Sequence, residues 1–305
     1  PNRLSVISST ISHLTKIFKK KTPDFLILLG DRAEVLGASI AGLHFNVPIV
    51  HMYGGDITQG GADEPTRHAI SKISNIHLTS NSSSYENVKK MGEENWRVHN
   101  TGLTSLDLLK DRFYKSKKYL EKKYKVDLGK PLIILIQHPV TWQIKDSKKQ
   151  INETLKALNK LKIQTIAVYP CSDPGFKNIV KSYEEFKRKN FFKLYKNIEI
   201  EDFYSLLKYS KILIGNSSCG ITECGYLMKY AINIGIRQQG RVSGKNVFNV
   251  SHNSKKIINQ INKILKMPNL KKKILIYGNG NSAKKIINII SKFSKRNDLI
   301  KKKFI

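Results

Sequence analysis

The sequence of 305 residues predicts an α/β fold built on parallel sheets in two domains. Short apolar runs typical of buried strands alternate with longer segments of helical spacing along the chain. Polar residues directly follow several of these runs, which is where an open parallel sheet places its ligands. A lysine-rich stretch of weak periodicity, 115–130, separates two such series, and we interpret it as a linker.

The first series begins with residues 25–29 (FLILL), an apolar run that predicts a buried strand. The segment 33–46, rich in Ala, Gly and Leu, predicts a helix, and the runs 47–51 and 76–79 predict two further strands. Together they indicate an N-terminal α/β domain with a parallel sheet, which we expect over residues 1–120.

The second series predicts strands at 132–136, 165–169 and 211–214. Between the first two of these strands, apolar residues recur at helical spacing and predict a helix that faces the core. They are Ile151, Leu155, Leu158 and Leu161. We expect this second α/β domain over residues 121–280, followed by a C-terminal helix and tail over 281–305.

Residues 278–283 (GNGNSA) match the pattern G-x-G-x-x-A of dinucleotide-binding loops. A lone match of this kind is weak, and too little chain follows it for a complete βαβαβ unit. We interpret the segment as a turn into a final helix, 283–293.

Hydrophobic residues make up 40% of the chain, so we expect a folded core rather than disorder. The formal net charge of +31 raises the question of nucleic-acid binding. The excess is mostly lysine scattered along the chain, without arginine and aromatic clusters or a nucleic-acid-binding motif. We therefore do not expect a nucleic-acid partner.

No apolar run approaches the roughly 18–20 residues of a membrane span, and no signal peptide is visible. The three cysteines, Cys171, Cys219 and Cys224, lack metal-ligand spacing and suggest a reducing compartment. We expect a cytoplasmic protein with no membrane partner and no bound metal.

Residues 214–223 (IGNSSCGITE) are the most informative segment of the chain. They predict the end of a buried strand, a tight turn and the start of a helix, whose unpaired N–H groups and dipole favour an anion. Glu223 is expected about one and a half turns into this helix, where a carboxylate could hold a ribose. The alternative interpretation is a Ser-capped helix without a ligand.

Other polar groups also follow predicted strands, and their convergence is a stronger signal than any one of them. These groups are Asp31 with Arg32, residues 51–56, and His138. Residues 63–68 (DEPTRH) place two acidic residues and a basic pair at a helix start, which also has a purely structural interpretation. Residues 237–241 (RQQGR) could grip a diphosphate or form a solvated loop.

The chain resembles the UDP-N-acetylglucosamine 2-epimerase family, and in particular its hydrolysing branch. The motifs that carry the likeness occur in order along nearly the whole chain: Gly30-Asp-Arg32, His51-x-x-Gly-Gly-Asp56, Asp63-Glu-x-x-Arg-His-Ala-Ile-x-Lys72, Gln137-His-Pro-Val-Thr141, Gly215-Asn-Ser-Ser-Cys-Gly220 with Glu223, and Gly235-x-Arg-Gln-x-x-Arg241.

This resemblance implies the two-domain fold of B-type glycosyltransferases (GT-B), with two Rossmann-like domains and the substrate in the cleft. In that fold a first βαβ segment precedes the position that is Pro1 here. We therefore expect the N-terminal domain to be incomplete and its sheet to present an unpaired edge.

The resemblance also implies a reaction, the conversion of UDP-N-acetylglucosamine and water to N-acetylmannosamine and UDP, without a cofactor or a metal. A base removes the C2 proton as UDP leaves C1, which gives a 2-acetamidoglucal; water then adds, and a proton returns to the opposite face of C2. This chemistry needs a base, an acid and stabilisation of the departing diphosphate.

By motif position, the resemblance implies catalytic and substrate-binding residues. The catalytic candidates are Asp31, Asp63, His138, Asp56 and Glu64. The carboxylates would transfer protons at the sugar, and the histidine would contact sugar or phosphate and could act as an acid. The substrate-binding candidates are Arg32, Arg67, Cys171, Ser217, Ser218, Gly220, Glu223 and Arg237.

Two positions depart from the family pattern. Tyr53 stands where the family often has Glu, and Cys171 stands where the most similar members tend to have Asn. The amino sugar could therefore differ, with a diacetylated bacillosamine nucleotide as one alternative. Two further alternatives are a non-hydrolysing epimerase and an inactive UDP-sugar-binding module. Because relatives form dimers or tetramers, we expect a homodimer or homotetramer that binds a UDP-sugar.

Overall fold

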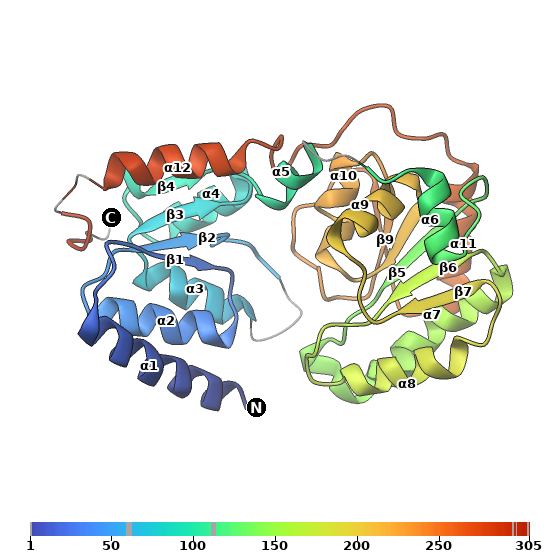
Figure 1. The fold of residues 1–305 in the computed structure, drawn as a ribbon, viewed down its shortest axis with the longest axis horizontal. Helices are drawn as coiled ribbons and strands as arrows, with labels where there is room; N and C mark the ends of the chain where they lie inside the picture. The colour runs from blue at the N-terminus through green and yellow to red at the C-terminus, as the bar shows by residue number, and fades with distance from the viewer. Residues whose placement is uncertain (1, 59–62, 111–113, 295, 297, 304) are drawn as a thin grey trace. The chain divides into compact units, whose positions relative to one another are not determined.

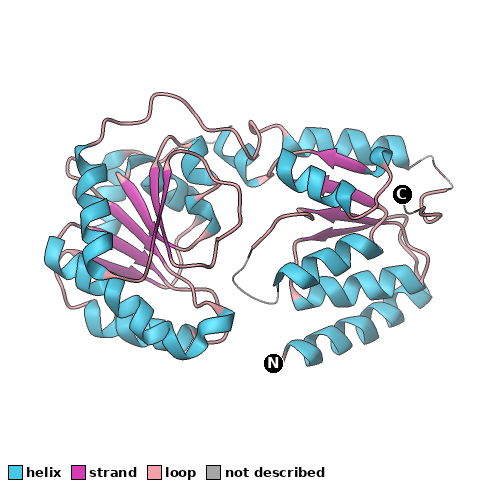
Figure 2. Ribbon diagram, turned by 180° about the vertical axis from the view of Figure 1, so that it is seen from behind, coloured by secondary structure: helices cyan, strands magenta, loops and turns pink. Residues whose placement is uncertain are grey.

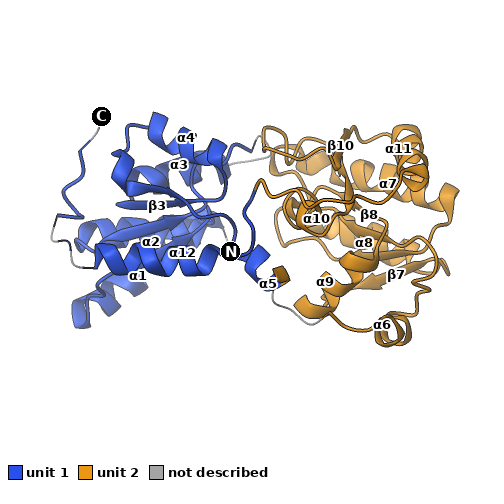
Figure 3. Ribbon diagram, turned by 90° about the horizontal axis from the view of Figure 1, so that it is seen from above, with its two compact units in different colours: residues 1–58, 62–108, 277–305 blue, residues 59–61, 109–276 orange. Residues whose placement is uncertain are grey.

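The structure is a computed structural model that describes residues 2–58, 63–110, 114–294, 296, 298–303 and 305. These residues form two compact units, which are coloured separately in Figure 3. Unit 1 contains the described residues up to 58, from 63 to 108 and from 277 onward, and unit 2 contains those from 109 to 276. The C-terminal segment is thus part of unit 1. Within the described chain, no helix has both the length and the apolar character needed to cross a membrane.

Unit 1 is built on a four-stranded parallel sheet in the order β1-β2-β3-β4. The strands are β1 (Leu26–Leu29), β2 (Ile49–Met52), β3 (Ile76–Thr79) and β4 (Val98–Asn100). The strands β2 and β3 are buried along their whole length, as expected where helices cover both faces of a parallel sheet. The edge strand β1 leaves Ile27 and Leu29 about half exposed.

Helices cover both faces of this sheet, as Figures 1 and 2 show. They are α2 (Ala33–His44), α3 (Asp63–Ile73), α4 (Ser82–Lys90) and α12 (Ser282–Phe293), with a 3₁₀ turn η1 (Asn95–Arg97) before β4. The helix α1 (Arg3–Lys20) packs on α2, and α5 (Ser105–Lys110) lies where the chain passes from unit 1 to unit 2. One buried cluster joins the sheet to α2 and α3 through Ala38 and Ile70, and another joins it to α12 through Ile286. The turn at 278–283 leads into α12, as the sequence predicts.

Unit 2 is built on a six-stranded parallel sheet in the order β10-β9-β8-β5-β6-β7. The strands are β5 (Ile133–Ile136), β6 (Thr165–Val168), β7 (Phe192–Tyr195), β8 (Ile212–Gly215), β9 (Tyr230–Ile234) and β10 (Val247–Val250). The β5, β8 and β9 strands are buried along their whole length, which explains the uninterrupted apolar sequences of β5 and β8.

The helices of unit 2 are α6 (Lys117–Tyr124), α7 (Ser147–Leu161), α8 (Phe176–Phe186), α9 (Ile200–Tyr209), α10 (Glu223–Tyr226) and α11 (Ser254–Lys266), with 3₁₀ segments η2 (Thr141–Asp146) and η3 (Ser218–Gly220). The core lies between the sheet and the helices α7, α8 and α11. Ile151, Leu155 and Leu158 of α7 are buried there, which confirms the helical stripe predicted from the sequence.

The expectation of a linker at 115–130 is wrong in part, because α6 occupies the middle of that stretch. The Ser116 side chain caps its first turn by accepting a hydrogen bond from the N–H of Tyr119. Leu120 and Tyr124, four residues apart, are buried on one side of the helix, and the Tyr124 hydroxyl donates to Asp202. The many lysines obscure this short apolar stripe in the sequence.

The ends of β5 and β8 approach each other closely because of Gly215. Its φ of 125° is accessible to glycine, and a Cβ at this position would lie 1.9 Å from the carbonyl oxygen of Ile136. Glycine at the end of β8 therefore allows the residues after the two strands to meet.

Candidate active site

Asn216 and His138, which follow β8 and β5, are joined by two hydrogen bonds. The Asn216 Oδ1 atom accepts from the backbone N–H of His138 at 2.6 Å, and its Nδ2 atom donates to the His138 carbonyl at 2.9 Å. Asn216 is buried, so both bonds are shielded from water. One planar amide therefore fixes the backbone of His138, and Pro139 further favours an extended conformation there.

The His138 ring is held as a neutral imidazole. Its Nδ1 atom accepts a hydrogen bond from the backbone N–H of Cys171 at 3.0 Å, so its proton lies on Nε2. Burial lowers the pKa of His138 to about 3, and the Arg237 charge contributes to the same effect. His138 therefore offers a neutral N–H donor, rather than the charged imidazolium that an ordinary histidine acid would supply.

Arg237 and Gln238 come from the loop after β9 and bind the same turn. The Arg237 Nη1 atom donates to the Asn216 carbonyl at 3.2 Å, and the Gln238 Nε2 atom donates to it at 3.0 Å. The Arg237 Nη2 atom also lies 4.0 Å from the Asp173 Oδ2 atom. A partly exposed guanidinium is thus held at the carboxyl edge of the sheet.

Cys171 and Asp173 form the third side of this group, in the loop after β6. The Cys171 thiol lies 3.0 Å from the Asp173 Oδ2 atom and donates to it. Burial, together with this hydrogen bond, raises the pKa of Cys171 to about 11. The side chain is therefore a protonated thiol and not a nucleophilic thiolate.

The segment after Asn216 differs from the helix that the sequence predicts. Ser218–Gly220 form a 3₁₀ turn, and α10 begins only at Glu223. The Ser218 carbonyl accepts from the N–H groups of both Ile221 and Thr222, so the chain tightens before the helix starts. Glu223 is consequently the first helical residue, buried and hydrogen-bonded by the Thr222 hydroxyl. Ser217 and Ser218, which follow Asn216 in the chain, are partly exposed.

In unit 1, Arg67 of α3 holds Asp31 at the end of β1. The Arg67 Nε atom donates to the Asp31 Oδ2 atom at 2.7 Å, and Nη2 donates to the same oxygen. Its Nη1 and Nη2 atoms also donate to the Asp56 carbonyl and the Thr58 hydroxyl. Arg67 is 4% exposed, and its guanidinium is engaged by these protein groups. In this structure it orients Asp31.

His51 stabilises the turn that carries Asp31 by a hydrogen bond to the Gly30 carbonyl. Its Nε2 atom donates to the Gly30 carbonyl at 2.9 Å, and its Nδ1 atom accepts from the Ser71 hydroxyl at 3.0 Å. Burial lowers the pKa of His51 to about 3, an effect that outweighs its bond to Gly30. The histidine of the 51–56 motif is therefore neutral and structural.

Asp56 is also enclosed by protein groups. Its Oδ1 atom accepts from the Ser80 hydroxyl at 3.0 Å, from the Asn81 amide at 3.2 Å and from the Ser84 hydroxyl. These contacts tie the end of β2 to the start of α4. The buried Asp56 carboxylate therefore stabilises the loop after β2. The family resemblance places it among the catalytic candidates.

Asp63, Glu64 and Arg32 are more exposed. The Asp63 Oδ1 atom accepts from Arg3 at 3.1 Å, and the Glu64 Oε2 atom accepts from the N–H of Thr58. Arg32 donates to Glu34 and has a side chain that is 68% exposed. Tyr53, at the departure from the family pattern, bonds to the hydroxyl of Thr104 at 2.7 Å and so fills a structural role.

Of the residues predicted from the sequence, His138, Cys171 and Arg237 are brought together in unit 2, with Asn216 between His138 and Arg237. Ser217, Ser218 and Gly220 follow Asn216 along the chain, and Asp31 meets Arg67 in unit 1. Sequence reasoning misses Asp173 and Gln238, and it gives Asn216 no role of its own. Asp173 follows Cys171 by two residues after a predicted strand, and that position is the signal that could have identified it.

A model of the UDP-N-acetylglucosamine 2-epimerase family matches residues 2–291. The UDP-N,N'-diacetylbacillosamine 2-epimerase (hydrolyzing) of Legionella pneumophila is 31% identical over 282 residues, which are 91% of this chain and 74% of that protein. The GDP/UDP-N,N'-diacetylbacillosamine 2-epimerase (hydrolyzing) of Campylobacter jejuni is 34% identical over 244 residues, 79% of this chain and 64% of that protein.

Among solved structures, the UDP-GlcNAc 2-epimerase from Neisseria meningitidis, bound to UDP-GlcNAc, superposes with a TM-score of 0.80. The match covers 96% of this chain and 82% of that one at 20% sequence identity, and it confirms the predicted GT-B fold of two Rossmann-like units. Fold, motif order and the length of the family match agree, and this chain belongs to the UDP-N-acetylglucosamine 2-epimerase family.

Proposed function

We propose that the chain is a hydrolysing 2-epimerase that acts on a UDP-linked 2-acetamido sugar and releases UDP with the free 2-epimeric sugar. The observation that carries this proposal is the group formed by His138, Asn216 and Arg237 at the carboxyl edge of the unit 2 sheet. The names of the Legionella and Campylobacter relatives support the hydrolysing character.

In this proposal, unit 2 binds the UDP diphosphate. Arg237 supplies a charged donor, the His138 Nε2–H supplies a neutral one, and Ser217 and Ser218 supply hydroxyls. Fixed donors aimed at a leaving diphosphate stabilise charge as the C1–O bond breaks. A neutral His138 suits this role, because it donates without changing its charge with pH near neutrality. Glu223 would bind the ribose.

We assign proton transfer at the sugar to carboxylates of unit 1. Asp31 is the first candidate because Arg67 and the turn at Gly30 fix its position while its side chain stays 23% exposed. Asp63 and Glu64 are the further candidates, at the first turn of α3. Asp56 is less suited, since three side chains already occupy its Oδ1 atom.

The atoms balance in two steps. The base takes the proton from C2, the electron pair forms the C1–C2 double bond, and the C1–O bond breaks with its electrons leaving on UDP. Water then adds its hydroxyl to C1, and a proton reaches the opposite face of C2. Without the water step, UDP would return to C1 and the product would be the 2-epimeric UDP-sugar.

The substrate that we propose first is UDP-N-acetylglucosamine, which would give N-acetylmannosamine. A second candidate is UDP-N,N'-diacetylbacillosamine, because the two relatives compared above carry that sugar in their names. The thiol of Cys171 in place of an amide is the observation in this chain that favours a different sugar-nucleotide.

Incubation with each UDP-sugar in deuterated water, followed by proton NMR, tests the proposal. We expect free UDP, free 2-epimeric sugar and deuterium at C2 with one of the two substrates. The D31N variant should bind UDP but lose C2 exchange, and D24N, the same change at an exposed position, is the matched control. An epimer that remains attached to UDP would mean a non-hydrolysing enzyme. UDP binding without exchange would mean an inactive binding module.

A further inference from the structure

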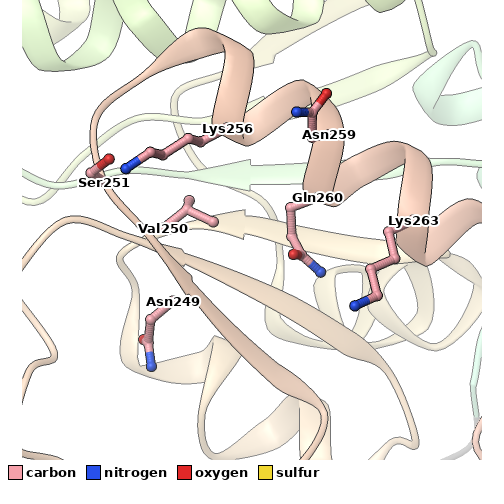
Figure 4. Close-up of a pocket in the computed structure, with 7 residues that line it drawn as sticks. All are labelled: Asn249, Val250, Ser251, Lys256, Asn259, Gln260 and Lys263. Carbon is pink, nitrogen blue, oxygen red and sulfur yellow. The ribbon is translucent and has the colours of Figure 1, made fainter.

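An open cavity of unit 2, lined by both polar and apolar atoms, lies between the edge strand β10 and the helix α11, apart from the group around His138 (Figure 4). Its volume is about 390 Å³. Residues 249–251, at the end of β10, form one wall, and one side of α11 forms the other. Among the described strands β10 pairs with β9 alone, so the cavity borders the open edge of the sheet.

The α11 wall is a stripe of polar side chains. Lys256, Asn259, Gln260 and Lys263 are spaced at i, i+3, i+4 and i+7, which places them on one side of the helix. The two lysines are about 10 Å apart along the helix axis, at 1.5 Å per residue. In Figure 4 the Lys256 side chain extends toward Ser251, and the ends of Gln260 and Lys263 point to the same side.

The chemistry of this lining suits an anion that carries hydroxyl groups. Two ammonium groups, three amides and the Ser251 hydroxyl line the cavity, and no Asp or Glu is among the described residues that do so. Lysines pair with a phosphate or carboxylate, and amide side chains both donate to and accept from hydroxyls. Val250 and the carbon atoms of the longer side chains supply the apolar part of the lining.

Two polar side chains beside the cavity have buried atoms without partners. The Gln260 Nε2 atom, and both ring nitrogens of His252, make no hydrogen bond within the described part of the chain. Buried polar atoms in native proteins are nearly always paired with protein, water or ligand groups. Gln260 lines the cavity, and His252 directly follows its Ser251 wall.

The same wall is connected to the loop that carries Arg237. The Val250 carbonyl accepts a hydrogen bond from the N–H of Gly235 at 2.8 Å. The His252 ring packs so closely on Gly235 that a Cβ there would lie 2.1 Å from its Nε2 atom. Gly235 precedes Arg237 by two residues. A displacement of the cavity wall would therefore shift Gly235 and, through it, the position of the Arg237 guanidinium.

We propose that this cavity binds a small anionic molecule rich in hydroxyl groups, a sugar phosphate or a sugar acid, as an effector. Occupancy pulls Lys256 and Gln260 onto the ligand and changes the packing of His252 against Gly235. The binding site stands independently of the reaction, whereas the coupling to Arg237 rests on the proposed UDP site.

Isothermal titration calorimetry of the full chain tests the binding site, with UDP present so that the proposed nucleotide site is filled. The probes are glucose 6-phosphate, gluconate and inorganic phosphate. We expect one of the first two to bind at one site per chain. The variant K256Q/K263Q should weaken that binding by about tenfold or more, because two charge-assisted contacts are lost.

The matched control is K255Q/K266Q, which removes the same charge from the same helix at exposed positions outside the cavity. It should change the dissociation constant by less than about twofold, since distant surface charges contribute little. Tighter binding of glucose 6-phosphate than of gluconate identifies a phosphate ligand, and the reverse identifies a carboxylate. The proposal is overturned if neither binds, if inorganic phosphate binds equally well, or if the control loses as much affinity.

The coupling is measured as the UDP affinity with and without the bound probe. We expect a change of at least about twofold, absent in K256Q/K263Q, because linkage between two sites is reciprocal. If the probe binds but the UDP affinity does not change, the proposed coupling is contradicted and the proposed binding site stands. Failure of UDP to bind under any condition would contradict the proposed function and not the cavity.

Discussion

The backbone N–H of Cys171 donates a hydrogen bond to the Nδ1 atom of His138 at 3.0 Å. Because a backbone amide cannot accept, this contact fixes which nitrogen of the ring carries the proton. His51 is fixed in the same tautomer by the Gly30 carbonyl on Nε2 and the Ser71 hydroxyl on Nδ1. Each unit therefore places a neutral histidine at or just after a strand end, and the fold determines which ring nitrogen carries its proton.

We predict that both histidines remain neutral where an ordinary histidine titrates. Burial lowers the pKa of His51 and of His138 to about 3, below the value of about 6.5 in an unfolded chain. Between these values the unfolded chain binds more protons, so stability is full above about pH 6.5 and falls as the pH drops toward 3. Urea unfolding between about pH 4 and 8 should show this slope, and H138Q should reduce it.

Nitrogen NMR gives an independent check of the same tautomer. The His138 Nε2 atom should keep the chemical shift of a protonated nitrogen, and Nδ1 that of an unprotonated acceptor, throughout about pH 5 to 8. A shift of both nitrogens toward the imidazolium values within this range would contradict the neutral assignment.

The second prediction concerns Arg67. Replacing it with Met should destabilise unit 1 by about 3 kcal/mol or more, because Asp31 and the Asp56 carbonyl lose a buried partner. The matched control is R32Q, since Arg32 is largely exposed and should contribute less than about 1 kcal/mol to stability. Denaturant unfolding measures both free energies. Equal effects of the two changes would show that the Asp31 contact is not a structural anchor.

The sequence predicts the fold well because continuous apolar runs mark buried parallel strands. Residues 25–29, 132–136 and 211–214 contain strands β1, β5 and β8 within a residue or two. The helix α1 and the strand β10 are not predicted, because α1 mixes serines and lysines with its apolar positions and β10 is only partly buried. Helix α6 is hidden in the same way by its lysines.

The candidate site is predicted in part, since strand ends identify His138 and Asp31 but not the partners that orient them. Periodicity does not reveal that Asn216 brackets the His138 backbone, or that Arg67 turns inward to Asp31. Asn216 lies 78 residues after His138, and Arg67 lies 36 residues after Asp31. Such contacts depend on how the folded chain directs each side chain, which a local sequence pattern does not contain. The 3₁₀ turn before Glu223 likewise depends on how the chain packs after Gly215.

The third prediction concerns Asn216. In N216D the Oδ1 atom still accepts from the His138 N–H, but the second oxygen faces the His138 carbonyl in place of a donor. We expect a loss of about 1–3 kcal/mol in stability and a UDP affinity reduced by about tenfold or more, since the His138 backbone is no longer held. The exposed change N262D adds the same charge on α11 and serves as the control. If N216D binds UDP with unchanged affinity, the two hydrogen bonds between Asn216 and the His138 backbone are not required for nucleotide binding.

The fourth prediction concerns Lys302, whose ammonium group is buried in unit 1 although it lies near the chain end. Its Nζ atom donates to the Lys72 and Ser74 carbonyls at 2.8 Å and pairs with Glu93 at 2.7 Å. Burial alone would raise the pKa of Glu93, but hydrogen bonds from His77 and Lys302 outweigh it and lower the pKa to about 2. The tail segment is thus anchored by a buried charge pair.

K302M removes a cation from the buried Glu93 carboxylate and leaves it only Lys72 and His77, so it should cost about 3 kcal/mol or more in unfolding free energy. K301M, a neighbouring exposed lysine, should cost less than about 0.5 kcal/mol. The double variant K302M/E93Q should recover part of the loss, and a double-mutant cycle by thermal unfolding measures that coupling. Additive effects of the two changes would mean that Glu93 is stabilised by Lys72 and His77 alone, and that the tail is held by the Arg97 contacts to the carbonyls of Leu299 and Lys301.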